Sequence, residues 1–276
     1  FIARIRRAIA EERPDGYLLG EVWEDGTTKI AYSKRRKYLL GRETHGLMNY
    51  PFRTALLDFL RGGDAAAFRE RMEELREHYP APAYYGAMNF LSTHDTPRLL
   101  TLLGHEGDAP ATRDERAAYL LSEEEKSRGT ALLKLAALIL YTFPGSPMLY
   151  YGDEAGMQGF EDPFNRGPYP WGHEDAALLR YFRQLGALRK AHEALQRGTI
   201  DYCAAQGRVL AFRRASNSEK CITAVNAGEQ SAALTLPWDA PLAQDALTRQ
   251  SFFCCDGVLR LTLEPYGAVL LIEPEN

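Results

Sequence analysis

The sequence predicts an α/β protein, with a parallel sheet covered by helices in residues 1–198 and an all-β antiparallel domain in residues 199–276. Up to residue 198, short apolar runs alternate four times with helical patterns, which is typical of a parallel sheet with helical crossovers. From residue 199, short β-rich runs are separated by Gly, Asn, Ser and Asp, which indicates antiparallel strands and turns. With 276 residues, 45% of them hydrophobic, the chain is long enough to bury a core in both parts.

In chain order, apolar residues at helical spacing predict a helix over residues 1–10, which ends before the turn residues Pro14-Asp15-Gly16. Apolar runs that end in polar residues predict four buried parallel strands, at 17–23, 46–50, 87–91 and 147–154. Amphipathic patterns predict the principal helices at 52–60, 65–78, 128–141 and 175–195. In the second part, strands are expected at 209–212, 221–225 and 268–272.

Acidic residues follow three of the predicted parallel strands. Glu21 follows the first strand, His94 and Asp95 follow the third, and Asp153-Glu154 follow the fourth. The carboxyl ends of the strands in a (β/α)8 barrel form the rim where catalysis takes place. Two carboxyl groups that face one pocket suit glycosidic bond cleavage, because one can protonate the leaving oxygen while another stabilises an oxocarbenium-like centre.

Simpler explanations exist for each of these residues taken alone. A Glu after a strand is more often an ordinary surface or loop-capping residue. Asp95, followed by Thr96-Pro97, could cap a helix, because Asp is favoured at the N-cap and Pro in the first turn. Asp153 and Glu154 fit a structural turn at the strand end better than a metal-binding pair, so no metal site is predicted.

Several motifs in order along the chain carry a family resemblance. Gly20–Trp23 (GEVW), Ser92–Arg98 (STHDTPR) and Phe143–Glu154 (FPGSPMLYYGDE) together resemble the α-amylase family of glycoside hydrolases. His45–Arg53 (HGLMNYPFR) and the Asp162–Arg166 loop are similar to the branch that contains cyclomaltodextrinase, neopullulanase and maltogenic amylase. The resemblance covers essentially the whole chain. It implies that residues 1–198 are the carboxyl-terminal half of a TIM (β/α)8 barrel, strands five to eight, and that residues 199–276 form an antiparallel β-sandwich domain.

The resemblance also implies roles for individual residues. Glu21 would be the general acid/base, and Asp95 a further catalytic carboxylate that holds sugar hydroxyls and stabilises the transition state. The residues expected to bind substrate or to organise the site are Trp23, His94, Arg98 and Arg166. The implied reaction is retaining hydrolysis of α-1,4 glucosidic bonds, with α-1,6 bonds as a further candidate, in maltodextrins, cyclodextrins, starch or pullulan. No cofactor is implied.

Two alternatives to this hydrolase remain open at the level of sequence. One is a related glucosyltransferase or a sucrose- or trehalose-active enzyme. The other is a non-catalytic glucan-binding protein that has kept the architecture. The presence of both Glu21 and Asp95 argues against the second alternative.

One catalytic group of the family is not matched. The family nucleophile is an Asp at the end of the fourth barrel strand, in a segment of the type Arg-Leu-Asp, and nothing in this sequence matches that segment. Phe1 to Ala10 resembles the helix that follows this strand, so the nucleophile is expected upstream of Phe1. The resemblance therefore implies a fragment that is inactive alone and lacks its amino-terminal half, as well as a domain through which the intact protein would form a homodimer.

Composition limits the partners and the location. The net charge of −4 predicts no basic face, which argues against nucleic acid as a partner. The longest apolar run, 132–143, is interrupted by Lys134 and is shorter than the roughly 20 residues that span a bilayer. The four cysteines have no metal-cage spacing, which favours free buried thiols and a cytoplasmic location.

Overall fold

A computed structural model describes residues 1–274, and it places four short parallel strands side by side. β1 pairs with β4, β5 pairs with β6, and a bridge between Met48 and Met88 joins the two pairs, so the order along the sheet follows the chain. The strands are β1 (Leu19–Gly20), β4 (Gly46–Leu47), β5 (Met88–Asn89) and β6 (Ser146–Pro147). This is the arrangement expected for consecutive strands of a (β/α)8 barrel, and it agrees with the predicted fold class.

The fourth strand differs from its prediction over 147–154. Its regular part ends at Pro147, and residues 151–156 form consecutive turns. Gly152 and Gly156 have φ angles of +88° and +76°, a region that favours glycine and is incompatible with an extended strand. Asp153 and Glu154 therefore lie in a turn, which was the simpler of the two explanations for this pair.

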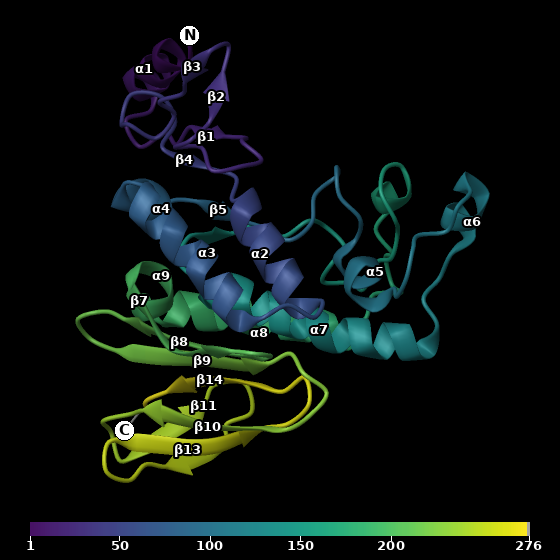
Figure 1. Cartoon of the computed structure of the whole chain (residues 1–276), viewed down its shortest axis with the longest axis vertical. Helices are drawn as coiled ribbons and strands as arrows, with labels where there is room; N and C mark the ends of the chain where they lie inside the picture. Colours follow the sequence, from purple (N-terminus) through teal and green to yellow (C-terminus); the bar gives the residue numbers. More distant parts are fainter. Residues whose placement is uncertain (275–276) are drawn as a thin grey trace.

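Helices cover the sheet and connect its strands (Figure 1). The predicted helices are present, and several begin at a side-chain cap: Asp64 caps the helix that starts at Ala65, and Ser122 forms a capping box with Glu125 in the helix that starts at Glu123. The long helices are α1 (Ile2–Glu12), α2 (Tyr50–Leu60), α3 (Ala65–His78), α7 (Glu123–Thr142) and α8 (Ala176–Ala191). The sequence did not indicate the hairpin β2 (Ile30–Ala31) and β3 (Lys34–Arg35), nor the short helices α4 (Ala81–Tyr85), α5 (Leu99–Gly104) and α6 (Arg113–Ala118).

The β part is a sandwich of two antiparallel sheets. The six-stranded sheet has the order β12-β11-β14-β9-β8-β7, and a two-stranded sheet of β10 and β13 faces it. Residues from both sheets, among them Ile222, Leu236, Trp238 and Leu259, form a separate core. The strands are β7 (Thr199–Gln206), β8 (Val209–Ala215), β9 (Lys220–Asn226), β10 (Ala232–Pro237), β11 (Leu242–Asp245), β12 (Ser251–Phe253), β13 (Val258–Leu263) and β14 (Ala268–Ile272).

A larger core joins the helical part to the sandwich. α7 and α8 lie between the parallel strands and β8–β9 (Figure 1). Phe143, which follows α7, contacts Phe52 on one side and Phe212 of β8 on the other, with ring centroids 5.1 and 5.6 Å apart. The last helix, α9 (Glu193–Arg197), ends two residues before β7 begins. The two parts therefore pack through buried apolar side chains and not only through the connecting chain.

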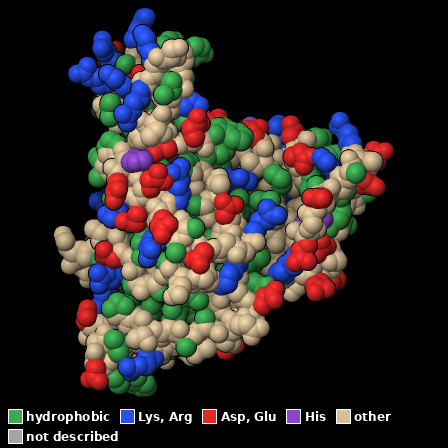
Figure 2. All heavy atoms as spheres, viewed as in Figure 1, with side chains coloured by type: hydrophobic (Ala, Val, Ile, Leu, Met, Phe, Trp, Pro, Cys, Tyr) green, Lys and Arg blue, Asp and Glu red, His purple; other side chains and the backbone are tan. Residues whose placement is uncertain are grey.

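The amino-terminal lobe, formed by α1 and the β2–β3 hairpin, lies at the top of the molecule (Figure 1). No residue of α1 is buried, although Ile2, Ile5 and Ile9 share one face, and Phe1 is 93% exposed. Lys and Arg side chains gather over this lobe (Figure 2), including those of Lys34–Lys37. The prediction of no basic face was therefore wrong for this lobe, because the net charge is a sum over the whole chain and does not show how the charges are distributed.

Two further sequence predictions concern cysteines and membranes. All four cysteines are free thiols, but only Cys221 is buried and Cys255 is exposed, so burial was predicted correctly for one of them. In residues 1–274 no helix is both long and apolar enough to cross a bilayer.

Candidate active site

Glu21 emerges directly after β1, and its side chain is exposed. Its Oε1 atom accepts hydrogen bonds from Trp23 Nε1 at 3.0 Å and from the Tyr50 hydroxyl at 2.9 Å. The Trp23 and Tyr50 rings are stacked, with centroids 4.5 Å apart. Trp23 remains 58% exposed, so one aromatic surface beside the carboxylate is open to a ligand. The aromatic ring next to Glu21 in sequence is therefore also its neighbour in space.

Tyr50 is placed by the start of α2. Asn49 caps this helix by accepting a hydrogen bond from the Phe52 N–H at 3.1 Å. The Asn49 side chain also donates to Asn89 Oδ1 on β5 at 2.8 Å, which ties the start of α2 to the neighbouring strand. This arrangement holds the Tyr50 hydroxyl at the rim formed by the carboxyl ends of the strands.

Asp95 lies in the segment after β5, beside His94. The His94 Nε2 atom is 3.3 Å from Asp95 Oδ2, and Arg166 Nη2 is 3.7 Å from Asp95 Oδ1. The backbone N–H of Asp95 donates to Thr93 Oγ1 at 3.1 Å. The alternative role of Asp95 as a helix cap is wrong, because α5 begins at Leu99 and position 98 has no side-chain cap.

The two carboxylates and Tyr50 follow neighbouring strands of the same sheet. Burial, the hydrogen bond to Glu21, and the negative charges of Glu21 and Asp95 raise the pKa of Tyr50 well above its usual range. Glu21 follows β1 and Asp95 follows β5, while Tyr50 follows β4, the strand between them, and its hydroxyl contacts Glu21 directly. The structure thus brings Glu21 and Asp95 to the same rim of the parallel sheet, with an aromatic residue between them.

Arg98 has a different environment from the other candidate residues. Its side chain is 0% exposed, and its guanidinium stacks against Tyr150 and Tyr151 at 4.4 and 4.5 Å from their ring centroids. It donates to the Tyr151 carbonyl and lies 3.8 Å from Asp153 Oδ1. A buried guanidinium cannot line a substrate groove, so of its two expected roles only the organising one fits this position.

Arg166 and Asn165 come from the 3-10 turn η1 (Phe164–Arg166) and reach back to the Asp95 segment. Arg166 is exposed, pairs with Asp162 at 3.0 Å, and donates to the His94 carbonyl at 3.2 Å. Asn165 is buried, and its Nδ2 donates to the carbonyls of His94 and Thr96 at 2.8 and 2.7 Å. Arg166 therefore lies beside the exposed carboxylate of Asp95, while the buried Asn165 binds the backbone of the segment that carries Asp95.

Asp153 was named from the sequence only as a turn residue, and three other residues that shape the site were not identified: Tyr50, Ser92 and Asn165. Their partners lie 29 to 72 positions away along the chain, so no local pattern marks the contacts. The only available signal was their presence inside the motifs HGLMNYPFR, STHDTPR, YYGDE and DPFNR.

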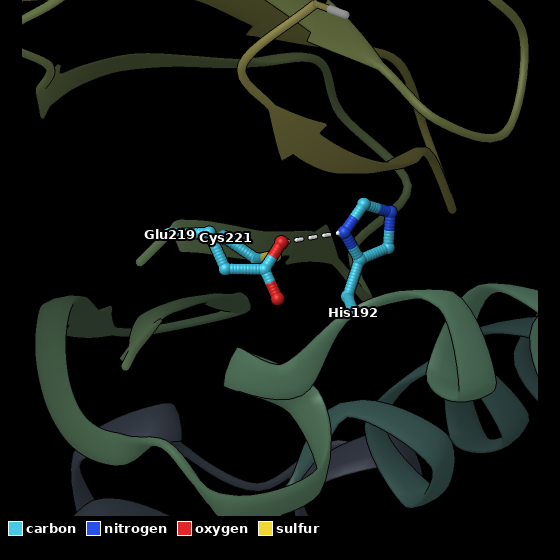
Figure 3. A group of neighbouring side chains, drawn as sticks. All are labelled: His192, Glu219 and Cys221. Carbon is cyan, nitrogen blue, oxygen red and sulfur yellow. Dashed lines mark hydrogen bonds and ion pairs between the residues drawn. The ribbon is translucent and has the colours of Figure 1, made fainter. Parts of the chain in front are cut away.

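One group of side chains away from this rim could hold a metal ion (Figure 3). His192 Nδ1 lies 2.8 Å from Glu219 Oε2, and the Cys221 thiol is close to both. Glu219 Oε1 also accepts a hydrogen bond from the Ala194 N–H at 2.8 Å, so these contacts serve to anchor the start of α9 on the sandwich. Burial and the charge of Glu219 raise the pKa of Cys221 to about 12, which disfavours the thiolate that a metal requires.

Two family descriptions match consecutive parts of the chain. Residues 1–174 match "Alpha amylase, catalytic domain". Residues 204–270 match "Maltogenic Amylase, C-terminal domain". The first match includes Glu21, Asp95 and Arg166, and the second covers most of the sandwich.

Individual proteins are similar over much of this chain. A cyclomaltodextrinase from Geobacillus thermopakistaniensis is 33% identical over 278 residues, covering 98% of this chain and 42% of that protein. An amylopullulanase from Thermoanaerobacter thermohydrosulfuricus is 34% identical over 226 residues, covering 78% of this chain and 14% of that protein. The solved structure of a debranching enzyme from Nostoc punctiforme is 26% identical, with a TM-score of 0.78, and covers 99% of this chain and 55% of the other. The chain spans between 11% and 42% of the length of the curated relatives compared.

Proposed function

The chain belongs to the α-amylase family, and on this premise we propose that it supplies the general acid/base and a second carboxylate of a retaining α-glucan hydrolase. The observation that carries the proposal is the placement of Glu21 and Asp95 after β1 and β5, two strands of one parallel sheet, with Tyr50, which follows the strand between them, hydrogen-bonded to Glu21. Retaining glycosidases pair a general acid/base with a carboxylate nucleophile across the bond that is cleaved, and Glu21 would be the acid/base of that pair. The names of the relatives, cyclomaltodextrinase and amylopullulanase, support an α-glucan as substrate.

In the proposed reaction, Glu21 donates its proton to the glycosidic oxygen as the bond to the anomeric carbon breaks. A carboxylate nucleophile attacks that carbon and forms a glycosyl-enzyme ester. Glu21, now ionised, removes a proton from water, and the water oxygen releases the sugar from the ester with the original anomeric configuration. Asp95 and His94 would hold hydroxyl groups of the sugar ring, and the open face of Trp23 would stack on a neighbouring ring.

We further infer that the nucleophile comes from residues outside these 276. No segment of the chain matches the Arg-Leu-Asp type in which the family carries it. In the described residues, β1 pairs only with β4, and the apolar face of α1 is uncovered. Both features fit a further strand and helix packed beside β1, whose carboxyl end would then lie next to Glu21.

The test compares the 276-residue chain with the natural protein extended by the residues encoded before Phe1. We expect the extended protein to hydrolyse maltodextrins and cyclodextrins and the 276-residue chain to show no turnover. In the extended protein, Glu21→Gln should lower kcat by about 10²–10⁴-fold, the usual contribution of a positioned general acid. Glu24→Gln is the matched control, because Glu24 lies in the same segment but pairs with Lys29 on the surface.

Three results would contradict the proposal. Turnover by the 276-residue chain alone would show that the nucleophile lies within it. Unimpaired hydrolysis by the Glu21→Gln variant would remove Glu21 from the mechanism, and glucan binding without any hydrolysis would favour a binding protein. Analysis of the products would separate hydrolysis from glucosyl transfer, since transfer yields longer oligosaccharides.

A further inference from the structure

The segment Ser92–Arg98 carries His94 and Asp95, yet it belongs to neither a helix nor a strand. Its backbone geometry is set by hydrogen bonds within the segment, such as that from the Asp95 N–H to Thr93 Oγ1, and by side chains from other elements. Both ends of the segment contact one buried carboxylate. Asp153 Oδ2 accepts a hydrogen bond from the Ser92 hydroxyl, and Asp153 Oδ1 faces Arg98 Nη1 at 3.8 Å.

Arg98 has little freedom to move away from this carboxylate. Two tyrosine rings enclose its guanidinium, and its backbone N–H donates to the Gly159 carbonyl at 2.9 Å. Asp153 itself is only 2% exposed, so bulk solvent screens the attraction between the two charges only weakly. Ser92 and Arg98, at the two ends of the segment, thus both interact with the Asp153 carboxylate.

The middle of the segment is held separately. Asn165 donates to the carbonyls of Thr93, His94 and Thr96 at 3.3, 2.8 and 2.7 Å. Three carbonyl oxygens that converge on one amide require a tight turn, and this turn directs the His94 and Asp95 side chains outward to the rim. The centre of the segment is therefore fixed by Asn165, while its ends depend on Asp153.

We propose that Asp153 is a positioning residue that fixes both ends of the segment bearing His94 and Asp95 and so directs these side chains toward Glu21. The role rests on the function proposed above, because it matters for catalysis only if His94 and Asp95 contact substrate. Keeping a carboxylate in this dry position has a cost, since burial raises the pKa of Asp153 to about 6. The contacts that Asp153 makes with Ser92 and Arg98 are a physical reason for a carboxylate at this buried position.

The first experiment does not depend on activity. The chain has only six histidines, so the imidazole NMR signals of the 276-residue protein can be resolved, and His94→Gln identifies those of His94. Asp153→Asn removes the charge that faces Arg98, and Ser92→Ala removes the hydroxyl at the other end. We expect each variant to shift or broaden the His94 signals while the other five histidines keep theirs. Glu154→Gln is the matched control, because this neighbouring carboxylate accepts its hydrogen bond from the Gly152 N–H within the same turn.

The second experiment measures hydrolysis by the extended protein. Asp153→Asn and Ser92→Ala should lower kcat by about 10- to 100-fold with little change in KM, because small displacements of catalytic groups reduce the rate more than ground-state binding. A purely structural role would instead lower the amount of folded enzyme and leave kcat per folded molecule unchanged. Thermal melting of each variant separates these cases.

The two experiments fail in different ways. If the extended wild-type protein has no hydrolase activity, the proposed function is wrong, and the NMR comparison still decides whether Asp153 orders the segment. Unchanged His94 signals in both folded variants would overturn the positioning role. Since Ser92→Ala deletes only one hydroxyl group, it provides a result even if Asp153→Asn does not fold.

Discussion

Replacing Arg214 should uncouple the helical part of the protein from the β-sandwich. Arg214 lies on β8, is fully buried, and donates hydrogen bonds from its guanidinium to four backbone carbonyls. The acceptors, at distances of 2.5 to 3.3 Å, are Thr142 at the end of α7, Leu195 and Gly198 at α9, and Thr199 at the start of β7. One side chain thus binds the carboxyl ends of two helices to the sheet.

The size of the effect follows from these contacts. A hydrogen bond to a charged group contributes about 1.5–3 kcal/mol, and the substitution leaves all four carbonyls without this donor. The penalty for burying the guanidinium, which lowers the pKa of Arg214 to about 10, offsets part of the gain. We therefore expect Arg214→Met to lower the free energy of unfolding by about 3–5 kcal/mol, as when a buried charge network is broken.

Urea unfolding followed by circular dichroism measures this change. Arg213→Met is the matched control, because Arg213 is the preceding residue on the same strand but forms a surface pair with Asp201 at 3.1 Å. We expect the control to cost less than about 1 kcal/mol. A loss below about 1 kcal/mol for Arg214→Met would refute the reasoning, since it would mean that the four carbonyls find other partners.

Three further predictions concern stability. Gly129→Ala should destabilise the protein by about 1–3 kcal/mol, because the added Cβ would lie 2.8 Å from Gly104 Cα. Gly186→Ala should instead stabilise it by up to about 1 kcal/mol, because its Cβ would meet nothing closer than 3.9 Å. Thermal melting that shifted both variants in the same direction would contradict this. Asp64→Ala should lower the free energy of unfolding in urea by about 1–2 kcal/mol. The Asp64 carboxylate accepts one hydrogen bond from a backbone N–H of α3 at 2.7 Å and another from a backbone N–H of the β7–β8 turn at 3.2 Å. An unchanged urea midpoint would show that the cap is dispensable. Burial raises the pKa of Asp153 to about 6 from an ordinary value of 3.8, so the folded state binds the extra proton and this residue's contribution should fall by about 2 kcal/mol as pH rises from about 4 to 6. Comparing unfolding free energies of wild type and Asp153→Asn across that range checks the sign, and parallel pH dependences would refute it.

The class of fold was predictable from the sequence because it depends on local patterns, and the catalytic candidates were proposed from motifs that resemble the α-amylase family. Alternating apolar runs and amphipathic stretches mark parallel strands and their helices, and the 65–78 helix was predicted with both of its ends. Glu21 and Asp95 stand where an apolar run stops, which is a local signal of a strand end at a rim. The strands themselves are much shorter than predicted, because a strand extends only as far as its neighbours offer hydrogen-bond partners.

The parts that sequence could not specify depend on contacts between distant segments. Asp153 read as an ordinary turn residue, and only the fold places it beside Ser92, 61 positions earlier in the chain. The burial of Arg98 could not be predicted from the sequence either, because the two tyrosine rings that enclose its guanidinium come from a distant part of the chain.

What the sequence determined by itself was the kind of protein, a parallel α/β unit with acidic strand ends followed by a β-sandwich, because periodicity and residue type are written locally along the chain. What only the tertiary structure decided was how those acids are supported. The hydrogen bond from Tyr50 to Glu21, the contacts of Asp153 with both ends of the Asp95 segment, and the attachment of two helices by Arg214 all arise from chain segments that meet only after folding. The free energy of such contacts depends on burial and distance, and neither quantity is defined until the chain has packed.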